Sequence, residues 1–466
     1  MSQLIRIDEI SHSRHQLAMR FSLDDLRFDV TYWYNDVDLK HLERKFGTAA
    51  MSKIYFHIMA FEVNKLSSLK PAAIDWGPYS HHCTEAFHTL WQTIIHKVWA
   101  QWRFENELPN YVGPTCVNST ASDSIAPLEN ELHDPDILCF CGGGKDSLVA
   151  MKLLENADLS YSSFAYSNSI YGASQPQHQL IERLLAHGKP ARRHQLWVYD
   201  SFVDSPVLQL YPEYGVRTLA AAETPSSIFA ALPIVLQHGY QYLALAHEHS
   251  ANVGNLVWES TGEEINHQWG KSDEAERLLN DYLRLELISN CSYFSALQPV
   301  YDVLIFNLLR NHLEAVPATH SCNVRKPWCC RCPKCAYVWL NYMAYLPTEL
   351  VNSIFDVNLF DLEENQRWFY QMLGLGKHTP FECIGQIAEV QLAFELCKRK
   401  GLTGKAMDMY LREFSSIDLD PIIAKYLSVD QAQMRIPEAI AKKIIPQMHE
   451  AAKEAHEYIA SCAKQA

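Results

Sequence analysis

A glycine turn between an apolar strand and an amphipathic helix constrains the fold of this chain more than any other segment. Residues 137–141 (ILCFC) form a short, wholly apolar run, which is typical of a buried parallel strand. Three glycines follow, and after them Leu148, Met151 and Leu154 recur every third residue, which predicts a helix with one buried face. Such a turn directs unpaired backbone N–H groups and the positive end of the helix dipole at one point. The segment therefore predicts an anion site at the carboxyl edge of a parallel sheet.

A phosphate group is the anion that fits this turn best, because glycines allow close approach and a lysine adds positive charge. The turn reads GGGKDS over residues 142–147, which matches neither the Walker A pattern GxxxxGK[ST] nor the dinucleotide pattern GxGxxG. It resembles the PP-loop of ATP pyrophosphatases, usually written SGGxDS, although Gly142 stands where that group normally has serine. The alternative is an ordinary structural turn. The resemblance implies that the phosphates of ATP contact Gly142, Gly143, Gly144, Lys145 and Ser147, and that Asp146 binds Mg²⁺ or the loop itself.

Composition excludes several classes of function. The 466 residues are 48% hydrophobic and 20% charged, as expected of a globular chain with two or three domains. A formal charge of −14 argues against a large nucleic-acid interface. There is no signal pattern and no apolar run of membrane-spanning length, so we expect a cytoplasmic protein without nucleic-acid or membrane partners. In that compartment the 13 cysteines predict thiols or metal ligands rather than disulfides.

Strand and helix signals alternate after a Ser-, Asp- and Pro-rich stretch at residues 116–136. We therefore expect an α/β fold with a central parallel sheet. Its PP-loop domain, similar to the adenine nucleotide alpha hydrolases, would span residues 134–345 and end in a metal site. An N-terminal α+β domain at residues 1–133 is a candidate for substrate binding, and residues 346–466 predict a helical region.

A cysteine cluster predicts a metal centre. Cys322, Cys329, Cys332 and Cys335 have the spacing C-x6-C-x2-C-x2-C, which can place four thiolates around one tetrahedral ion. Cys330 directly adjoins Cys329 and is left out of the set. We expect structural Zn²⁺. An iron–sulfur cluster is less favoured, because the C-x3-C-P that completes a ferredoxin-type run is absent.

Proton-transfer groups gather after the strand expected near residue 245. His247, Glu248, His249, His267 and Lys271 fall within one short stretch, although each alone is more typical of an ordinary hydrogen-bonded side chain. PP-loop enzymes often have a GHxxDD-like turn here, and its paired carboxylates are missing. Magnesium would then depend on Asp146, Glu248 or the phosphates themselves.

Several motifs together resemble one bacterial family, the ATP-dependent UDP-N-acetylmuramoyl-L-alanyl-L-glutamate epimerases. They are FCGGGKDSLVAMKLLE, TGEEINHQWGKS, CNVRKPWCCRCPKC and PFECIG. The resemblance implies an isomerase of peptidoglycan precursor synthesis that acts on a UDP-sugar dipeptide. It implies that the terminal L-glutamate becomes D-glutamate through an acyl-adenylate, with ATP converted to AMP and pyrophosphate. His247, Glu248, His267 and Cys383 are then the candidates for moving the α-proton, and a buried apolar cysteine is the alternative for Cys383.

Other enzyme classes remain open at this point. An amide- or nitrile-forming ligase of the deazaguanine synthase type shares the adenylation step and the four-cysteine site, but it would not exchange an α-proton. A transfer-RNA thiolase or lysidine synthase is disfavoured by the acidic charge. A third alternative is a non-catalytic, metal-dependent scaffold in which the loop has lost its function. Such a protein would fail to bind ATP.

Overall fold

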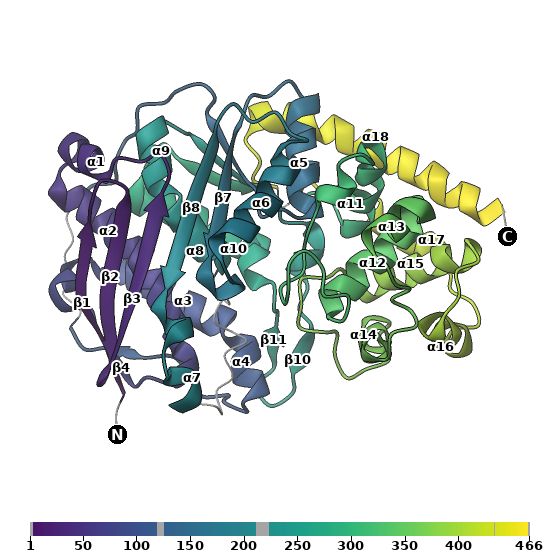
Figure 1. The fold of residues 1–466 in the computed structure, drawn as a ribbon, viewed down its shortest axis with the longest axis horizontal. Coiled ribbons are helices and arrows are strands. Elements are labelled where there is room, and N and C mark those ends of the chain that lie inside the picture. Colours follow the sequence, from purple (N-terminus) through teal and green to yellow (C-terminus); the bar gives the residue numbers. More distant parts are fainter. Residues whose placement is uncertain (1–2, 119–124, 211–222, 433, 465–466) are drawn as a thin grey trace.

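One mixed sheet joins the N-terminal and central parts of the chain, and a helical region follows it (Figure 1). The computed structural model describes residues 3–118, 125–210, 223–432 and 434–464. In sheet order the strands are β12 (Ser292–Ser295), β9 (Tyr242–Leu245), β6 (Ile137–Phe140), β7 (Ser162–Asn168), β8 (Arg193–Asp200), β3 (Leu26–Tyr34), β2 (Gln16–Leu23), β1 (Leu4–His12), β4 (Ala73–Asp75) and β5 (Thr115–Cys116).

The strands from β12 to β8 are parallel to one another, which confirms the predicted central parallel sheet. The sheet then continues through β3, β2 and β1 in antiparallel pairs. Val30 in β3 pairs with Asp200 in β8, so the N-terminal region is joined edge to edge with the central one. The sequence did not indicate this continuity. The expected domain boundaries at residues 133 and 345 stay predictions.

Both faces of the central sheet are buried. Ile137 and Cys139 of β6 belong to one hydrophobic core, whereas Leu138 between them belongs to a second core on the opposite face. Because successive side chains of a strand point to opposite faces, a wholly apolar run is what a strand covered on both sides requires.

Helices account for most of the remaining structure. Those of the first two regions are α1 (Leu39–Phe46), α2 (Thr48–Val63), α3 (Glu85–Val98), α4 (Ala100–Glu105), α5 (Lys145–Asn156), α6 (Ser174–Leu185), α7 (Val207–Leu210), α8 (Glu223–Ala230), α9 (Leu232–His238), α10 (Asp273–Tyr282) and α11 (Asp302–Leu308). A small antiparallel pair, β10 (Leu256–Trp258) and β11 (Glu263–Ile265), lies outside the main sheet.

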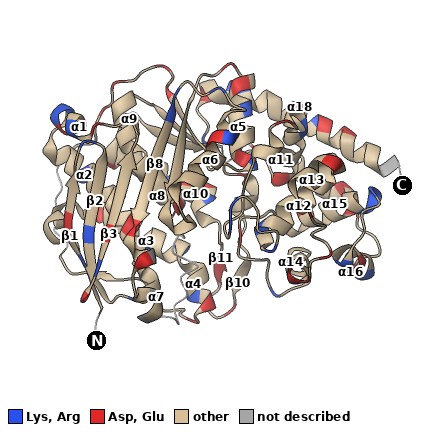
Figure 2. Cartoon of the chain, in the orientation of Figure 1, with Lys and Arg blue, Asp and Glu red and all other residues tan. Residues whose placement is uncertain are grey.

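The predicted C-terminal helical region is confirmed. It comprises α13 (Thr348–Ile354), α14 (Glu363–Met372), α15 (Ile387–Arg399), α16 (Lys405–Glu413), α17 (Asp420–Tyr426) and α18 (Glu438–Lys464), and it is preceded by α12 (Pro333–Tyr345). The long helix α18 packs against α11 and α5, and it carries Lys and Glu side by side on its exposed side, as in the pair Lys442–Glu438 at 2.6 Å (Figure 2). Within the described ranges, no helix combines the length and apolarity needed to cross a bilayer.

Candidate active site

The glycine turn has the predicted strand–turn–helix geometry. β6 ends at Phe140, and α5 begins at Lys145 with Gly144 as its N-cap. Gly143 has φ of +88°, and its carbonyl accepts a hydrogen bond of 2.8 Å from the backbone N–H of His320. A Cβ atom on Gly143 would lie 2.0 Å from the His320 ring, so glycine is required both by the left-handed backbone and by this close approach.

We expect Gly143→Ala to destabilise the fold by about 2 kcal/mol or more, because it combines a strained φ with a steric clash. Gly142→Ala is the matched control, since a Cβ atom there meets nothing within 4 Å and its φ is not positive. Urea unfolding measured for both variants checks the expectation. Equal unfolding midpoints would contradict it.

A cavity of about 260 Å³ opens beside this turn, at the carboxyl ends of β6, β7 and β9. Ligands of parallel α/β sheets bind at this edge. Gly142 and His247 line the cavity together with Tyr171, Glu223 and Lys326. The Tyr171 hydroxyl donates a hydrogen bond of 2.7 Å to Glu223, and burial raises the pKa of that carboxyl group.

The Lys145 side chain is buried and paired with carboxylates in this structure. It is 1% exposed, and its ammonium group forms ion pairs with Asp146 and Asp302. It also lies 4.9 Å from the centre of the Phe306 ring. The pairing with two carboxylates raises the pKa of Lys145 even though burial works to lower it. Its contact with ATP phosphates therefore stays a prediction.

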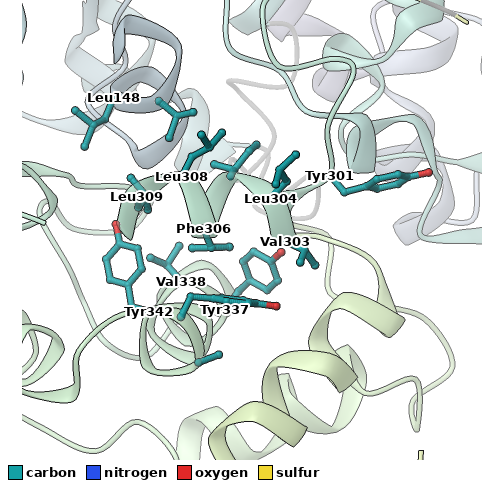
Figure 3. Packing of buried hydrophobic residues seen from close by; sticks show 14 of the residues in the cluster. Leu148, Tyr301, Val303, Leu304, Phe306, Leu308, Leu309, Tyr337, Val338 and Tyr342 are labelled. Carbon is teal, nitrogen blue, oxygen red and sulfur yellow. The ribbon is translucent and has the colours of Figure 1, made fainter. Parts of the chain in front are cut away.

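Asp302 is held in place by the packing of α11. Phe306 and Leu304 of this helix contact the core that also contains Leu148 of α5 and Tyr337 of α12, so α11 lies between the other two helices (Figure 3). The Tyr337 hydroxyl donates a hydrogen bond of 2.8 Å to Asp302. No pattern in the sequence indicated this carboxylate.

A thiol and an imidazole from distant parts of the chain meet in this structure. The ligand atoms of His267, Glu382 and Cys383 all lie within 4.8 Å of one another. Burial works to raise the pKa of the Cys383 thiol. The charge of Lys271 and the hydrogen bond with His267 outweigh it and lower that pKa to about 7. Two of the four predicted catalytic residues are therefore in direct contact.

Lys271 links this pair to the glycine turn. It hydrogen-bonds with Cys383, and the charges of Cys383, Glu248 and Asp146 raise its pKa against the effect of burial. Burial and the neighbouring carboxylates of Asp302 and Asp146 raise the pKa of Glu248. Asp146, Glu248, Lys271 and Cys383 thus form one electrostatically connected group beside the glycine turn.

The histidines of the 247–249 stretch have different roles in the fold. His247 is buried in the cavity wall with Nδ1 3.3 Å from the Tyr293 hydroxyl, and burial together with Lys271 lowers its pKa to about 3. It is therefore neutral and a weak base. The ring of His249 contacts Tyr301 and lies 3.1 Å from the carbonyl of Gln298, which places it in the packing beneath α17.

The four predicted metal ligands converge. Cys322 Sγ lies 3.8 Å from Cys332 Sγ, and Cys329 Sγ lies 3.8 Å from Cys335 Sγ. All four sulfur atoms lie within 4.8 Å of one another, and Cys330 is outside the group. Four thiolates about 2.3 Å from one tetrahedral zinc ion are about 3.8 Å apart, so the set fits zinc. Backbone N–H groups of Val324 and Arg325 donate to Cys322 Sγ, as is usual around thiolate ligands.

Comparison with known proteins matches two family models to this chain. The MurL N-terminal domain matches residues 225–296, and the MurL C-terminal domain matches residues 318–411. In these two segments the chain is similar to the MurL family. The two matched segments contain the thiol–imidazole pair, Lys271 and all four metal-site cysteines, whereas the glycine turn lies outside both. The resemblance stated from the motifs is thus confirmed at the level of the family, while its PP-loop label stays a prediction.

Three curated MurL relatives carry the name UDP-N-acetyl-alpha-D-muramoyl-L-alanyl-L-glutamate epimerase. The Micromonospora protein is 29% identical over 67% of this chain, the Salinispora tropica protein 28% over 64%, and the Xanthomonas oryzae protein 26% over 66%. The matches span 68%, 63% and 67% of the lengths of those relatives. Epimerases are isomerases, so the predicted enzyme class agrees with that of these relatives.

Proposed function

We propose that this protein inverts the terminal L-glutamate of UDP-N-acetylmuramoyl-L-alanyl-L-glutamate to D-glutamate, with ATP consumed to AMP and pyrophosphate. The observation that carries the proposal is the Cys383–His267 pair, a thiol with a pKa of about 7 that is joined through Lys271 to the glycine turn. A base of this strength is suited to proton abstraction near neutral pH. The names of the three relatives support the substrate.

Activation of the glutamate must precede proton removal. Taking the α-proton beside a free carboxylate would place a second negative charge next to the first. In the proposed step a carboxylate oxygen attacks the α-phosphorus of ATP, and the bond to pyrophosphate breaks. The backbone N–H groups of the turn and the N-terminus of α5 would hold the departing anion.

Cys383 is the proposed base. Its thiolate takes the α-proton, and the electron pair of the broken C–H bond delocalises into the acyl-adenylate carbonyl. Proton delivery to the opposite face gives the inverted centre. Water then cleaves the acyl-adenylate, which releases UDP-N-acetylmuramoyl-L-alanyl-D-glutamate and AMP. His267 stabilises the thiolate. Glu248, whose pKa is raised by burial and by Asp302 and Asp146, is the candidate proton donor for the second face, whereas His247 is neutral and has no proton to deliver.

In the proposed reaction Asp146 or Glu248 contributes to a magnesium site together with the phosphates of ATP. Asp146, Glu248 and Asp302 lie close enough for their charges to affect one another, and oxygen atoms are the ligands that Mg²⁺ prefers. Bound there with ATP, Mg²⁺ would offset the charge of the phosphates. The cofactors of the proposal are thus ATP and Mg²⁺, with structural Zn²⁺ at the four cysteines.

Lys271→Gln is expected to move the pH dependence of the reaction to higher pH. The thiolate is the active form, so the rate should rise as pH passes about 7 in the unaltered enzyme. Without the lysine charge the pKa of Cys383 returns toward its ordinary value of 9.0, and the midpoint should rise by about one unit or more. Lys271→Arg, which keeps the charge, is the control, and kcat/KM measured against pH for both variants checks the shift. An unchanged midpoint in Lys271→Gln would contradict the role of this lysine.

Proton NMR in D₂O tests the function itself. The enzyme is incubated with UDP-N-acetylmuramoyl-L-alanyl-L-glutamate, ATP and Mg²⁺. We expect the glutamate α-proton signal to disappear, D-glutamate to be recovered after hydrolysis, and AMP to form. An intact α-proton in folded enzyme that converts ATP to AMP would reject the epimerase and favour the amide- or nitrile-forming ligase, which is then tested by adding ammonia to a panel of carboxylates.

A further inference from the structure

A second group of metal-binding side chains lies at the far edge of the sheet. Cys83 is placed just before α3, His88 lies in the first turn of that helix, and Cys116 belongs to the edge strand β5. The ligand atoms of these three residues all lie within 4.8 Å of one another. Cys116 Sγ and His88 Nδ1 are 3.8 Å apart, and the two thiol groups are within hydrogen-bonding reach of each other.

This arrangement has the chemistry of a zinc site. Two thiolates and one imidazole form a ligand set that zinc uses, and sulfur and nitrogen ligands of one tetrahedral ion lie about 3.6 Å apart. The protein around these side chains buries one ligand and donates a hydrogen bond to another. Cys83 is buried, and the indole N–H of the fully buried Trp76 donates a hydrogen bond of 3.3 Å to Cys116 Sγ. A hydrogen bond to a ligand sulfur of this kind fixes the ligand's orientation.

The secondary structure positions all three ligands independently of any ion. Thr84 is the N-cap of α3, and its hydroxyl accepts a hydrogen bond of 3.1 Å from the N–H of Phe87. The cap fixes the start of the helix between Cys83 and His88. β5 has two residues and pairs in parallel with β4, which brings Cys116 against this helix start.

We propose that Cys83, His88 and Cys116 bind a second zinc-class divalent cation. The ion would tether the edge strand β5 to the N-terminus of α3. It is separate from the four-cysteine centre, and it does not depend on the proposed epimerase function.

Metal content of the full-length protein tests the proposal. Inductively coupled plasma mass spectrometry should find about two zinc ions per folded chain and about one in His88→Gln. His81→Gln is the matched control, because His81 is an exposed histidine in the same segment and lies outside the group; it should keep both ions. Equal zinc content in His88→Gln and His81→Gln would overturn the proposal.

A thiol count separates metal binding from a disulfide. Denatured protein freed of metal by a chelator should show all 13 cysteines as free thiols. Two fewer, with Cys83 and Cys116 as the protected pair in peptide mapping, would overturn the proposal in favour of a disulfide bond. Cobalt substitution gives a second readout: Cys116→Ser should weaken the thiolate-to-cobalt absorption of the loaded protein, and an unchanged spectrum would contradict the assignment.

Discussion

Cys383→Ala should abolish α-proton exchange, with a loss of about 1,000-fold, while adenylation of the glutamate continues. In the proposed reaction the thiolate acts only after the acyl-adenylate has formed. The variant also leaves the glycine turn, with Gly143 at φ of +88°, unaltered. Proton NMR in D₂O measures the exchange, and incorporation of labelled pyrophosphate into ATP measures adenylation. The diagnostic result is the separation of the two activities.

Two further variants sharpen this experiment. Cys383→Ser keeps the size of the side chain but replaces a group with a pKa of about 7 by one that stays protonated at neutral pH, so it should be nearly as inactive as alanine. Cys462→Ala removes a buried thiol from α18, far along the chain from the site, and should behave like the unaltered enzyme. Exchange at a normal rate in Cys383→Ala would remove the thiol from the mechanism and leave the histidines and Glu248 as the candidates.

Cys332→Ser should release the metal of the four-cysteine centre and lower the melting temperature by about 10 °C or more. Structural zinc sites contribute about 10–16 kcal/mol of apparent binding free energy, which is also folding free energy. Cys332 is both a ligand and the N-cap of α12, where its Sγ accepts the N–H of Cys335. Serine is a good N-cap but a poor zinc ligand, so this substitution separates loss of the metal from loss of the cap.

The loss of stability in Cys332→Ser should extend beyond the cysteines, because Tyr337 and Trp339 of α12 pack in the main C-terminal core. Zinc content and differential scanning calorimetry check the expectation. Cys330→Ser is the control: Cys330 adjoins the ligands but lies outside their group, and it should keep both the metal and the melting temperature. A Cys332→Ser protein that melts like the Cys330→Ser protein would mean that the centre does not support the fold.

Local signals explain how much of the fold could be predicted. The run at residues 137–141, the glycines and the spacing of Leu148, Met151 and Leu154 are all encoded within one short segment, and the structure shows the expected strand, turn and helix there. The pairing of Val30 with Asp200 could not be predicted in the same way. The hydrophobic pattern of a strand does not indicate which distant strand it pairs with.

The candidate site, too, could be predicted from the sequence only where its residues are close together in the chain. The set of four cysteine ligands, without Cys330, could be predicted from their spacing, because a tetrahedral ion restricts the intervals between its ligands. His267 and Cys383 could be named only as separate candidates. Their contact depends on the fold bringing residues 116 positions apart together, and the pKa of about 7 arises from that contact and from Lys271.

By itself the sequence determined the strand–turn–helix unit at residues 137–154 and the cluster of four cysteines, because each depends on residues that are near one another in the chain. Only the tertiary structure decided which titratable groups act together. It buries Lys145 between Asp146 and Asp302 and makes His247 neutral. It also sets the Cys383 thiol beside His267 and Lys271. The physical reason is that burial and neighbouring charge fix the protonation state of a side chain, and both are properties of the folded surroundings rather than of the residue.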